Sequence, residues 1–318
     1  MRELDAVSTR VAFGETLEEM AGEDESIVVV SADTARSMGL KGMERKYPDR
    51  VLNVGIAEQN MMTMAAGLAA CGFRAVATTY APFTCMRALE EARTFIAYPN
   101  LNVTVVGGMS GITGSIEGVT HQGQEDINIM CAIPNFVVAV AADACATREM
   151  VHVLMAHEGP VYLALGRSQA HRVFDDYHFE IGKGNLMRAG NDITLITYGS
   201  MLWRCQEAAD ALKSRGIDAR LIEMPCIKPL DEAMVLSAAR ETGAILTVED
   251  RNVNGGMGSY VCQTVCAHSP ALVACMGLPD TFAQSGLEDE LYEYCHLGTA
   301  DIVAAAEALW RQKGGSNA

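Results

Sequence analysis

VLNVGIAEQNMMTMAAGLAACG, residues 51–72, is the stretch of sequence that decides the fold. Its first six residues are mostly apolar and include β-branched side chains, which is typical of a buried strand. From Ala57 the pattern favours a helix that continues to Cys71, and Gly72 stands where a glycine commonly ends a helix. A strand that leads directly into a helix is the repeating unit of an α/β sheet.

The same alternation continues on both sides of this stretch. Further strands are predicted at 27–33, 74–79, 102–108, 136–142 and 161–166, and helices at 8–21, 82–97 and 147–157. Short apolar strands separated by helices predict a mostly parallel sheet that is covered on both faces. We therefore expect one α/β domain over residues 1–170.

A second domain follows a polar stretch. Residues 171–190 contain Gly182, Gly184 and Gly190 and are interpreted as a linker. The alternation then restarts, with strands predicted at 193–199, 219–224 and 244–250 and helices at 202–215 and 300–311. The sequence thus predicts a second α/β domain over residues 191–318.

The composition excludes several classes of function. Of the 318 residues, 49% are hydrophobic and 20% charged, and the formal net charge is −16, so the surface repels nucleic acid and anionic membranes. The apolar runs are far shorter than the ~20 residues that span a bilayer, and the N-terminal residues lack the apolar core of a signal peptide. Ten cysteines without a CxxC pair indicate reduced thiols. We expect a cytoplasmic protein without a nucleic-acid or membrane partner.

Residues 51–72 resemble the thiamine-diphosphate enzymes of the transketolase family. The resemblance continues through GSIEGVTHQG (114–123), YLALGR (162–167) and TVEDRNVNGGMGS (247–259). It implies that the two domains are the pyrimidine-binding domain and the C-terminal domain of a transketolase. It also implies that Glu58 contacts the aminopyrimidine ring of thiamine diphosphate, although an acidic residue also suits the first turn of a helix. A carboxyl group hydrogen-bonded to N1′ favours the imino form of the cofactor, which removes the proton from the thiazolium C2.

The resemblance assigns three further residues to the cofactor. Tyr80 and Phe83 match aromatic positions that flank the pyrimidine ring, a flat and mostly apolar group. Met86 departs from the family, because transketolases often carry a third aromatic residue there. Asp33 matches a position near the thiazolium ring. Without the resemblance, the two aromatic residues would be interpreted as core side chains.

Other positions point to the substrate. His121 matches the active-site histidine, which donates a hydrogen bond to a substrate oxygen as charge develops there. Glu117 stands where the family usually has an aspartate that contacts a sugar hydroxyl. Met109 stands where transketolases commonly have another histidine. These two departures put the usual pentose-phosphate substrates in doubt.

Arg10, Ser37 and Arg167 match the family's contacts to the substrate phosphate. The planar guanidinium group donates two parallel hydrogen bonds to a tetrahedral anion. The resemblance therefore implies a substrate that ends in a phosphate or a sulfonate.

The sequence contains no Gly-Asp-Gly motif, which in this family binds the metal ion of the cofactor's diphosphate. Mg²⁺ or Ca²⁺ prefers oxygen ligands, so the ligands are expected from a partner, an N-terminal transketolase subunit that carries the motif. The resemblance implies a two-plus-two heterotetramer in which two of these chains form a central dimer. The C-terminal domain is interpreted as structural and dimer-forming.

Several activities are compatible with this outline. The first hypothesis is the C-terminal subunit of a split transketolase that moves a two-carbon ketol unit between phosphosugars, or a specialised catabolic or sulfosugar variant of it. A β subunit of a 2-oxo-acid dehydrogenase first component has the same layout, but the phosphate contacts and THQ (120–122) argue against it. A deoxyxylulose-phosphate synthase-like carboligase would carry arginine at Met86. A non-catalytic assembly subunit would not need Glu58 and His121.

Overall fold

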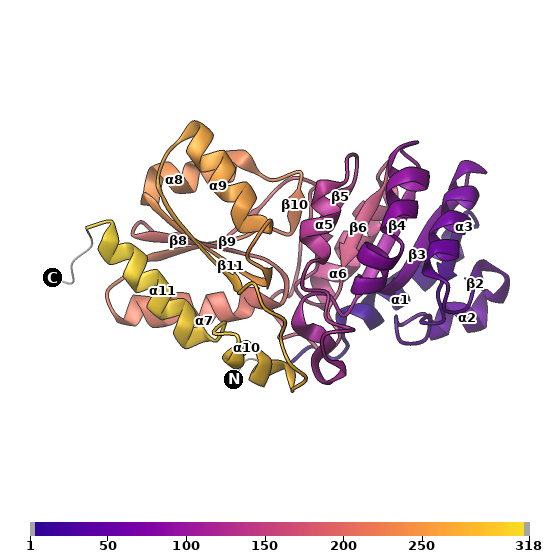
Figure 1. Ribbon diagram of the computed structural model, residues 1–318, viewed down its shortest axis with the longest axis horizontal. Coiled ribbons are helices and arrows are strands. Elements are labelled where there is room, and N and C mark those ends of the chain that lie inside the picture. The colour runs from indigo at the N-terminus through magenta and orange to yellow at the C-terminus, as the bar shows by residue number, and fades with distance from the viewer. Residues whose placement is uncertain (1–3, 315–318) are drawn as a thin grey trace.

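The structure, a computed structural model, describes residues 4–314 and contains two α/β sheets, each covered by helices on both faces (Figure 1). The first sheet has seven strands in the order β10-β5-β6-β4-β3-β1-β2, and β10 is the only antiparallel member. The predicted two-domain α/β fold with mostly parallel sheets is confirmed. The strands are β1 (Ile27–Ser31), β2 (Val51–Asn53), β3 (Arg74–Tyr80), β4 (Val103–Gly108), β5 (Val137–Val140), β6 (Val161–Ala164) and β10 (Cys226–Lys228).

Helices α1 (Thr9–Glu23) and α6 (Ala144–Ala156) pack on one face of this sheet, and α3 (Glu58–Ala70) and α5 (Asp126–Ala132) pack on the other. The Ser8 hydroxyl caps α1 by accepting a hydrogen bond from the backbone N–H of Val11. Asp143 caps α6 in the same way through the N–H of Ala146 at 2.8 Å, so this helix begins before the predicted 147. The short α2 (Lys41–Lys46) follows the loop after β1.

The regular helix predicted over 82–97 is wrong in its geometry. The segment consists of a π-helical stretch at Phe83–Arg87, the short α4 (Leu89–Glu91) and a second π-helical stretch at Ala92–Ala97. Ala88 interrupts it with φ −118° and ψ 27°, outside the helical region. Wide π turns of this kind occur often at functional sites, because they redirect side chains.

The second sheet has five strands in the order β12-β11-β8-β9-β7, with β7 antiparallel to β9. Helices α8 and α9 cover one face, α7 and α11 cover the other, and α10 packs beside them (Figure 1). β7 lies inside the stretch interpreted as a linker. The elements are β7 (Asn185–Arg188), β8 (Ile193–Thr197), β9 (Ala219–Glu223), β11 (Ala244–Asn252), β12 (Leu272–Leu278), α7 (Leu202–Ser214), α8 (Glu232–Thr242), α9 (Met257–His268), α10 (Glu288–Tyr294) and α11 (Thr299–Gln312).

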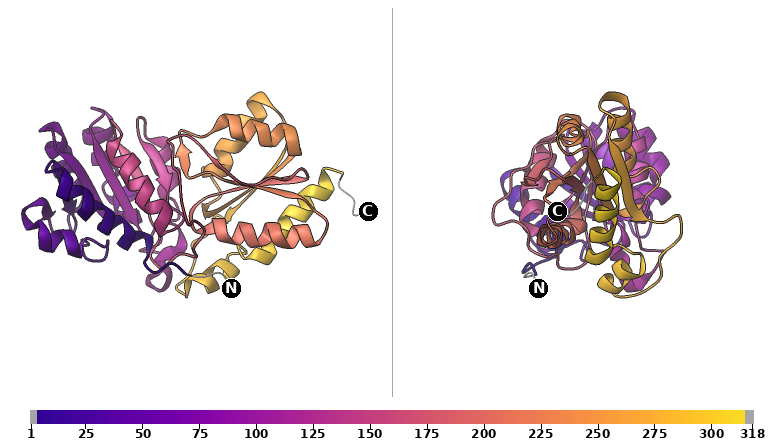
Figure 2. Two further views of the ribbon diagram at one scale, coloured as in Figure 1. Left: turned by 180° about the vertical axis from the view of Figure 1, so that it is seen from behind. Right: turned by 90° about the vertical axis from the view of Figure 1, so that its left-hand side faces the viewer.

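The two domains lie side by side (Figure 2) and are joined by a contact that we call the domain seam. It consists of β10, which extends the first sheet beside β5, and of the buried group Ser110, Asp126, Asp250 and Arg251. The guanidinium group of Arg251 donates to Asp126 Oδ1 at 2.7 Å and also binds Asp250 and Ser110. Within residues 4–314, no helix is long and apolar enough to cross a membrane.

Candidate active site

Most of the residues assigned by the resemblance lie at one edge of the first sheet. Parallel strands present their carboxyl ends at the same edge, where ligands of α/β proteins commonly bind. Five strands, β1, β2, β3, β4 and β6, are followed at this edge by loops that carry the assigned residues. The fold therefore brings together positions that are as far apart in sequence as Arg10 and Arg167.

Glu58 is the first residue of α3, and only 3% of it is exposed. Its Oε1 atom accepts a hydrogen bond from Arg87 Nη1 at 2.7 Å. The guanidinium carbon of Arg87 lies 4.2 Å from the centre of the Phe83 ring. One planar cation thus stacks on the assigned aromatic ring and binds the assigned carboxylate at the same time.

Tyr80, Phe83 and His121 form what we call the ring cluster. The centre of the His121 ring lies 5.7 Å from that of Tyr80 and 5.3 Å from that of Phe83, and the two aromatic rings are 5.9 Å apart. The Tyr80 hydroxyl donates to Ser37 Oγ at 2.9 Å. The structure therefore connects Ser37 to the ring cluster.

Glu117 links His121 to Arg167. Arg167 Nη2 lies 2.9 Å from Glu117 Oε1, and His121 Nε2 lies 3.7 Å from Glu117 Oε2. The longer side chain of this glutamate, compared with the aspartate of the family, lets one carboxylate reach both partners. In this arrangement the charge of Arg167 is already balanced by a carboxylate of the same chain.

Arg10 holds two loops of the site together. Its Nη1 donates to the Ser37 carbonyl at 2.6 Å and its Nη2 to the Arg167 carbonyl at 2.7 Å. Its Nε atom is buried and has no hydrogen-bond partner, and burial lowers the pKa of the guanidinium from its usual value. Arg10 thus positions the other two members of the assigned phosphate site and retains one unused donor.

Asp33 and Met109 are not part of the ring cluster. Asp33 has φ 59°, is exposed, and accepts a hydrogen bond from Asn53 Nδ2 at 3.0 Å. This pair joins the loops that follow β1 and β2. Met109 also has a positive φ, 57°, and is only 2% exposed, so its side chain packs inside the protein. The structure thus places a buried apolar side chain at this position.

The second domain contributes a loop that sequence reasoning missed. Ser115 Oγ donates to the Gly286 carbonyl at 2.8 Å, and Gln122 Nε2 donates to the Gln284 carbonyl at 2.9 Å. These bonds hold the loop that carries His121 against the C-terminal domain. Phe282, from the same stretch, is 71% exposed and lines the site cavity. Only the tertiary fold brings it here, and no local sequence signal marks it.

An open cavity of about 680 Å³ lies over the ring cluster. Phe83, Arg87, His121 and Glu125 line it, and burial raises the pKa of the Glu125 carboxyl. The stacked Arg87 guanidinium shows that a flat, hydrogen-bonding group fits between Phe83 and Glu58, so these residues suit an aminopyrimidine ring. Within residues 4–314, no group of three or more His, Cys, Asp or Glu side chains is placed to hold a metal ion.

Comparison with protein families identifies both halves of the chain. The model of the transketolase pyrimidine binding domain matches residues 5–172. The model of the transketolase C-terminal domain matches residues 182–302. Together they cover most of the chain.

Two similar curated proteins are subunits of specialised transketolases. The 6-deoxy-6-sulfo-D-fructose transketolase subunit SqwH of Clostridium sp. is 35% identical over 305 residues, which cover 96% of this chain and 95% of that protein. A subunit of the apulose-4-phosphate transketolase of Phocaeicola vulgatus is 33% identical over 302 residues, which cover 94% of this chain and 96% of that protein. Both are therefore similar to this chain from end to end.

A similar solved structure bears the description "Split gene transketolase, inactive beta4 tetramer". It is 38% identical, has a TM-score of 0.88, and the match covers 96% of this chain and 99% of that one. The arrangement of the two domains is thus shared with a split-gene protein over its whole length.

Proposed function

The chain belongs to the transketolase family, and we propose that it is the C-terminal subunit of a split transketolase that transfers a two-carbon ketol unit through thiamine diphosphate. One observation carries this proposal: the buried Glu58 carboxylate and the face of Phe83 hold one planar, hydrogen-bonding group between them. Thiamine diphosphate supplies a carbon centre that accepts and releases the ketol unit. The side chains of the protein orient the cofactor and bind the substrate.

Glu58 positions and polarises the aminopyrimidine. Because it is almost fully buried, water does not compete for its carboxylate, and a hydrogen bond to N1′ is strengthened. Tyr80 and Phe83 orient the ring by stacking. Glu58 would thereby favour the imino form of the aminopyrimidine, which removes the proton from the thiazolium C2, and so act as a positioned acid or base.

The groups around Glu117 bind the substrate. His121 donates a hydrogen bond to the substrate oxygen on which negative charge develops, as an oxyanion-stabilising donor does. Arg167 and the free donor of Arg10 bind a terminal phosphate or sulfonate, with the Ser37 hydroxyl beside them. An arriving anion competes with Glu117 for Arg167, and the released carboxylate then accepts hydrogen bonds from the sugar hydroxyls.

A partner completes the site. We propose an N-terminal subunit with the Gly-Asp-Gly motif, which binds the diphosphate and its Mg²⁺ or Ca²⁺, in a two-plus-two heterotetramer around a dimer of this chain. The split architecture of the similar proteins supports this proposal. The ten cysteines carry no disulfide, which supports a reducing, cytoplasmic location.

The test is reconstitution. This chain is mixed with the product of the neighbouring gene, if that product contains a Gly-Asp-Gly motif, and with thiamine diphosphate, magnesium, xylulose 5-phosphate and ribose 5-phosphate. Formation of sedoheptulose 7-phosphate only when both chains are present is the expected result. Tight, stoichiometric binding of cofactor and metal by this chain alone would overturn the need for a partner.

A specialised substrate is the second candidate. Glu117, paired with Arg167, stands where the resemblance implies an aspartate that contacts a sugar hydroxyl, and the buried Met109 stands where it implies a substrate-facing histidine. The similarity to subunits for 6-deoxy-6-sulfo-D-fructose and apulose 4-phosphate favours this alternative. A cofactor-loaded complex that accepts a sulfosugar and rejects xylulose 5-phosphate would establish it, whereas decarboxylation of pyruvate would favour a carboligase.

A further inference from the structure

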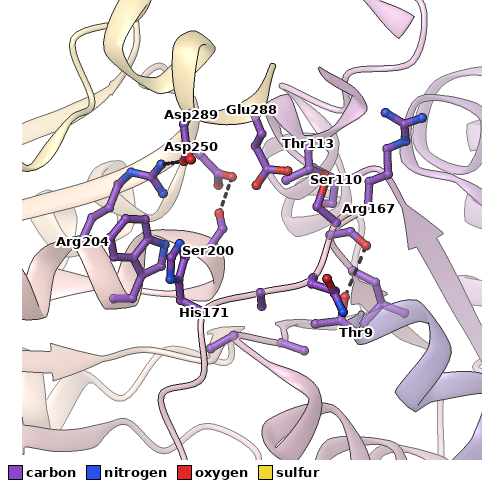
Figure 3. A pocket seen from close by; sticks show the side chains of 18 of the residues that line it. Thr9, Ser110, Thr113, Arg167, His171, Ser200, Arg204, Asp250, Glu288 and Asp289 are labelled. Carbon is purple, nitrogen blue, oxygen red and sulfur yellow. Dashed lines mark hydrogen bonds and ion pairs between the residues drawn. The ribbon is translucent and has the colours of Figure 1, made fainter. Parts of the chain in front are cut away.

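A second cavity, of about 320 Å³, lies between the two domains (Figure 3). Its walls are the carboxyl ends of β5 and β6 in the first sheet, the segment that follows β8, the end of β11 and the start of α10. Cavities at domain boundaries and at the carboxyl ends of parallel strands are preferred places for small ligands. Arg167 contributes to the wall, but its side chain points away from the cavity in Figure 3. The cavity thus adjoins the candidate active site at Arg167 but does not include its guanidinium group.

One carboxyl group points into this cavity and has an oxygen without a hydrogen-bond partner. The Glu288 carboxylate points toward its centre in Figure 3. Its Oε2 atom is shielded from solvent and accepts no hydrogen bond. Burial raises the pKa of Glu288 to about 7, and the nearby Ser168 hydroxyl and Arg204 charge oppose this rise only in part. A buried acceptor of this kind is costly unless a donor meets it.

The arginine side chains that line the cavity are already paired with carboxylates of the same chain. Arg204 Nη2 donates to Asp289 Oδ1 at 2.5 Å, and Arg251 is paired inside the domain seam. Asp250 accepts hydrogen bonds from Ser200 Oγ at 2.7 Å and Tyr292 Oη at 2.9 Å. Each arginine that lines the cavity therefore has a carboxylate partner, and an anionic ligand would find no free positive charge.

A flat aromatic wall stands beside these groups. The ring centres of His171 and Trp203 are 3.8 Å apart, with the two ring planes tilted by 34°, and Trp203 also contacts the Arg204 guanidinium. Aromatic faces attract flat rings and organic cations. The cavity thus combines an unpartnered acceptor, paired cations and an aromatic surface.

We propose that this interdomain cavity is a binding site for a small, planar organic cation, such as an amidine, a guanidine or an aromatic amine. Its cationic N–H groups donate to Glu288 Oε2, and its flat body lies against the His171–Trp203 wall. Because the ligand touches both domains, it also stabilises their contact. The site is independent of the proposed ketol transfer.

Three molecules of the same shape test the charge preference. Benzamidine, benzamide and benzoate are cationic, neutral and anionic, and each is titrated into the full chain by calorimetry. Fluorescence gives a second readout, because Trp203 is one of only two tryptophans in the sequence. We expect benzamidine to bind at least about tenfold more tightly than benzamide, which is the usual worth of a charge-assisted hydrogen bond, and benzoate to bind most weakly. Equal affinities, a preference for benzoate, or no binding of benzamidine at millimolar concentration would overturn the proposal.

Two matched variants locate the effect. Glu288→Gln removes the charge and keeps the shape, so the affinity for benzamidine should fall about tenfold, while the affinity for benzamide changes little. Glu293→Gln lies on the exposed side of the same helix and should leave both affinities unchanged. Unchanged binding of benzamidine by Glu288→Gln would contradict the assigned acceptor, even if the cavity binds the ligand.

Discussion

The domain seam and the candidate active site both contain carboxylate–arginine pairs, but only in the seam are both partners of each pair buried. Arg251 and Asp126 are almost completely buried and are satisfied by the same chain. In the active site, Arg87 is half exposed although it pairs with the buried Glu58. Buried pairs are costly to break, whereas pairs with an exposed partner contribute little. The seam is thus a permanent contact, and the pairs of the active site can be exchanged for cofactor and substrate.

The apolar residues around the domain seam and around the candidate active site also differ in burial. Core residues of both domains form one continuous hydrophobic cluster beside the seam. Around the active site, by contrast, large apolar side chains face solvent, among them Ile56, Met86, Ile116, Val119 and Phe282. Exposed apolar groups concentrated around a polar site are typical of a surface that another protein covers. This contrast supports a site that a second subunit completes.

The largest expected effect is on catalysis, in Glu58→Gln. The amide keeps the size of the side chain but cannot polarise the aminopyrimidine, so the activity of the assembled complex should fall by about 10²–10⁴-fold. Stability should change little, because the amide oxygen still accepts the hydrogen bond from Arg87. Steady-state kinetics and thermal unfolding measure the two effects. Glu90→Gln, on an exposed side chain nearby, is the control, and a fully active Glu58→Gln complex would remove Glu58 from the mechanism.

Stability should respond most to a change in the seam. Arg251→Leu leaves Asp126 and Asp250 buried without their counter-charge, so the free energy of unfolding should fall by about 3–5 kcal/mol. Arg36→Leu removes an exposed pair with Glu44 and should change it by less than about 1 kcal/mol. Urea denaturation of the full chain measures both values. If both variants lost the same free energy of unfolding, the buried pairs of the seam would be no more important for stability than the exposed pair.

A third way to sharpen the comparison is the dependence of stability on pH. Glu223 in β9 is fully buried, accepts hydrogen bonds from Tyr177 and Asn185 through Oε2, and has no partner at Oε1. Burial raises its pKa from 4.5 to about 7, with a further contribution from Asp143. The folded state therefore binds the proton more tightly than the unfolded state. The resulting stabilisation is fully present below about pH 4.5 and is lost as the pH rises through about 7.

We accordingly expect the melting temperature to be several degrees lower at pH 8 than at pH 5.5. Glu249 and Glu288, whose pKa values burial also raises to about 7, act in the same direction. Glu223→Gln should reduce this dependence, and Glu232→Gln, an exposed change at the start of α8, should not. A melting temperature that rises between these pH values would show that Glu223 is ionised in the folded protein.

The strands and helices that depend on the local spacing of apolar residues could be predicted from the sequence. The strands β1, β3 and β4 and the helix α3 followed from local pattern, because the strands are almost continuously buried and the helix buries one side at helical spacing. β10 was missed, since it is a strand only by pairing with β5 of the other domain. The π turns after Pro82 were also missed, because the spacing of apolar residues there resembles that of an ordinary helix.

The candidate site was predictable only through motifs. The resemblance indicated Glu58 and His121; His121 lines the open cavity, and Glu58 is bonded to Arg87, which also lines it. The partner of Glu58 could not be found this way, because nothing in the sequence distinguishes Arg87 from the neighbouring Arg93. Which arginine turns inward depends on the interruption at Ala88. Contacts between distant segments, such as that of Gln122 with Gln284, are likewise set by the tertiary fold.

The smallest expected effect concerns this arginine. In the proposed function the aminopyrimidine contacts the carboxylate of Glu58 and the face of Phe83, and Arg87 occupies both of these contacts. On this proposal the cofactor displaces the half-exposed guanidinium, and we expect the pair with Glu58 to contribute about 1 kcal/mol. Arg87→Ala should therefore tighten the binding of thiamine diphosphate to the assembled complex by about threefold, measured by calorimetry, whereas Arg93→Ala, an exposed change, should have no effect. Weaker binding by Arg87→Ala would mean that the displaced guanidinium moves to the cofactor and helps to hold it, so that the pair with Glu58 would be a resting position of a cofactor ligand.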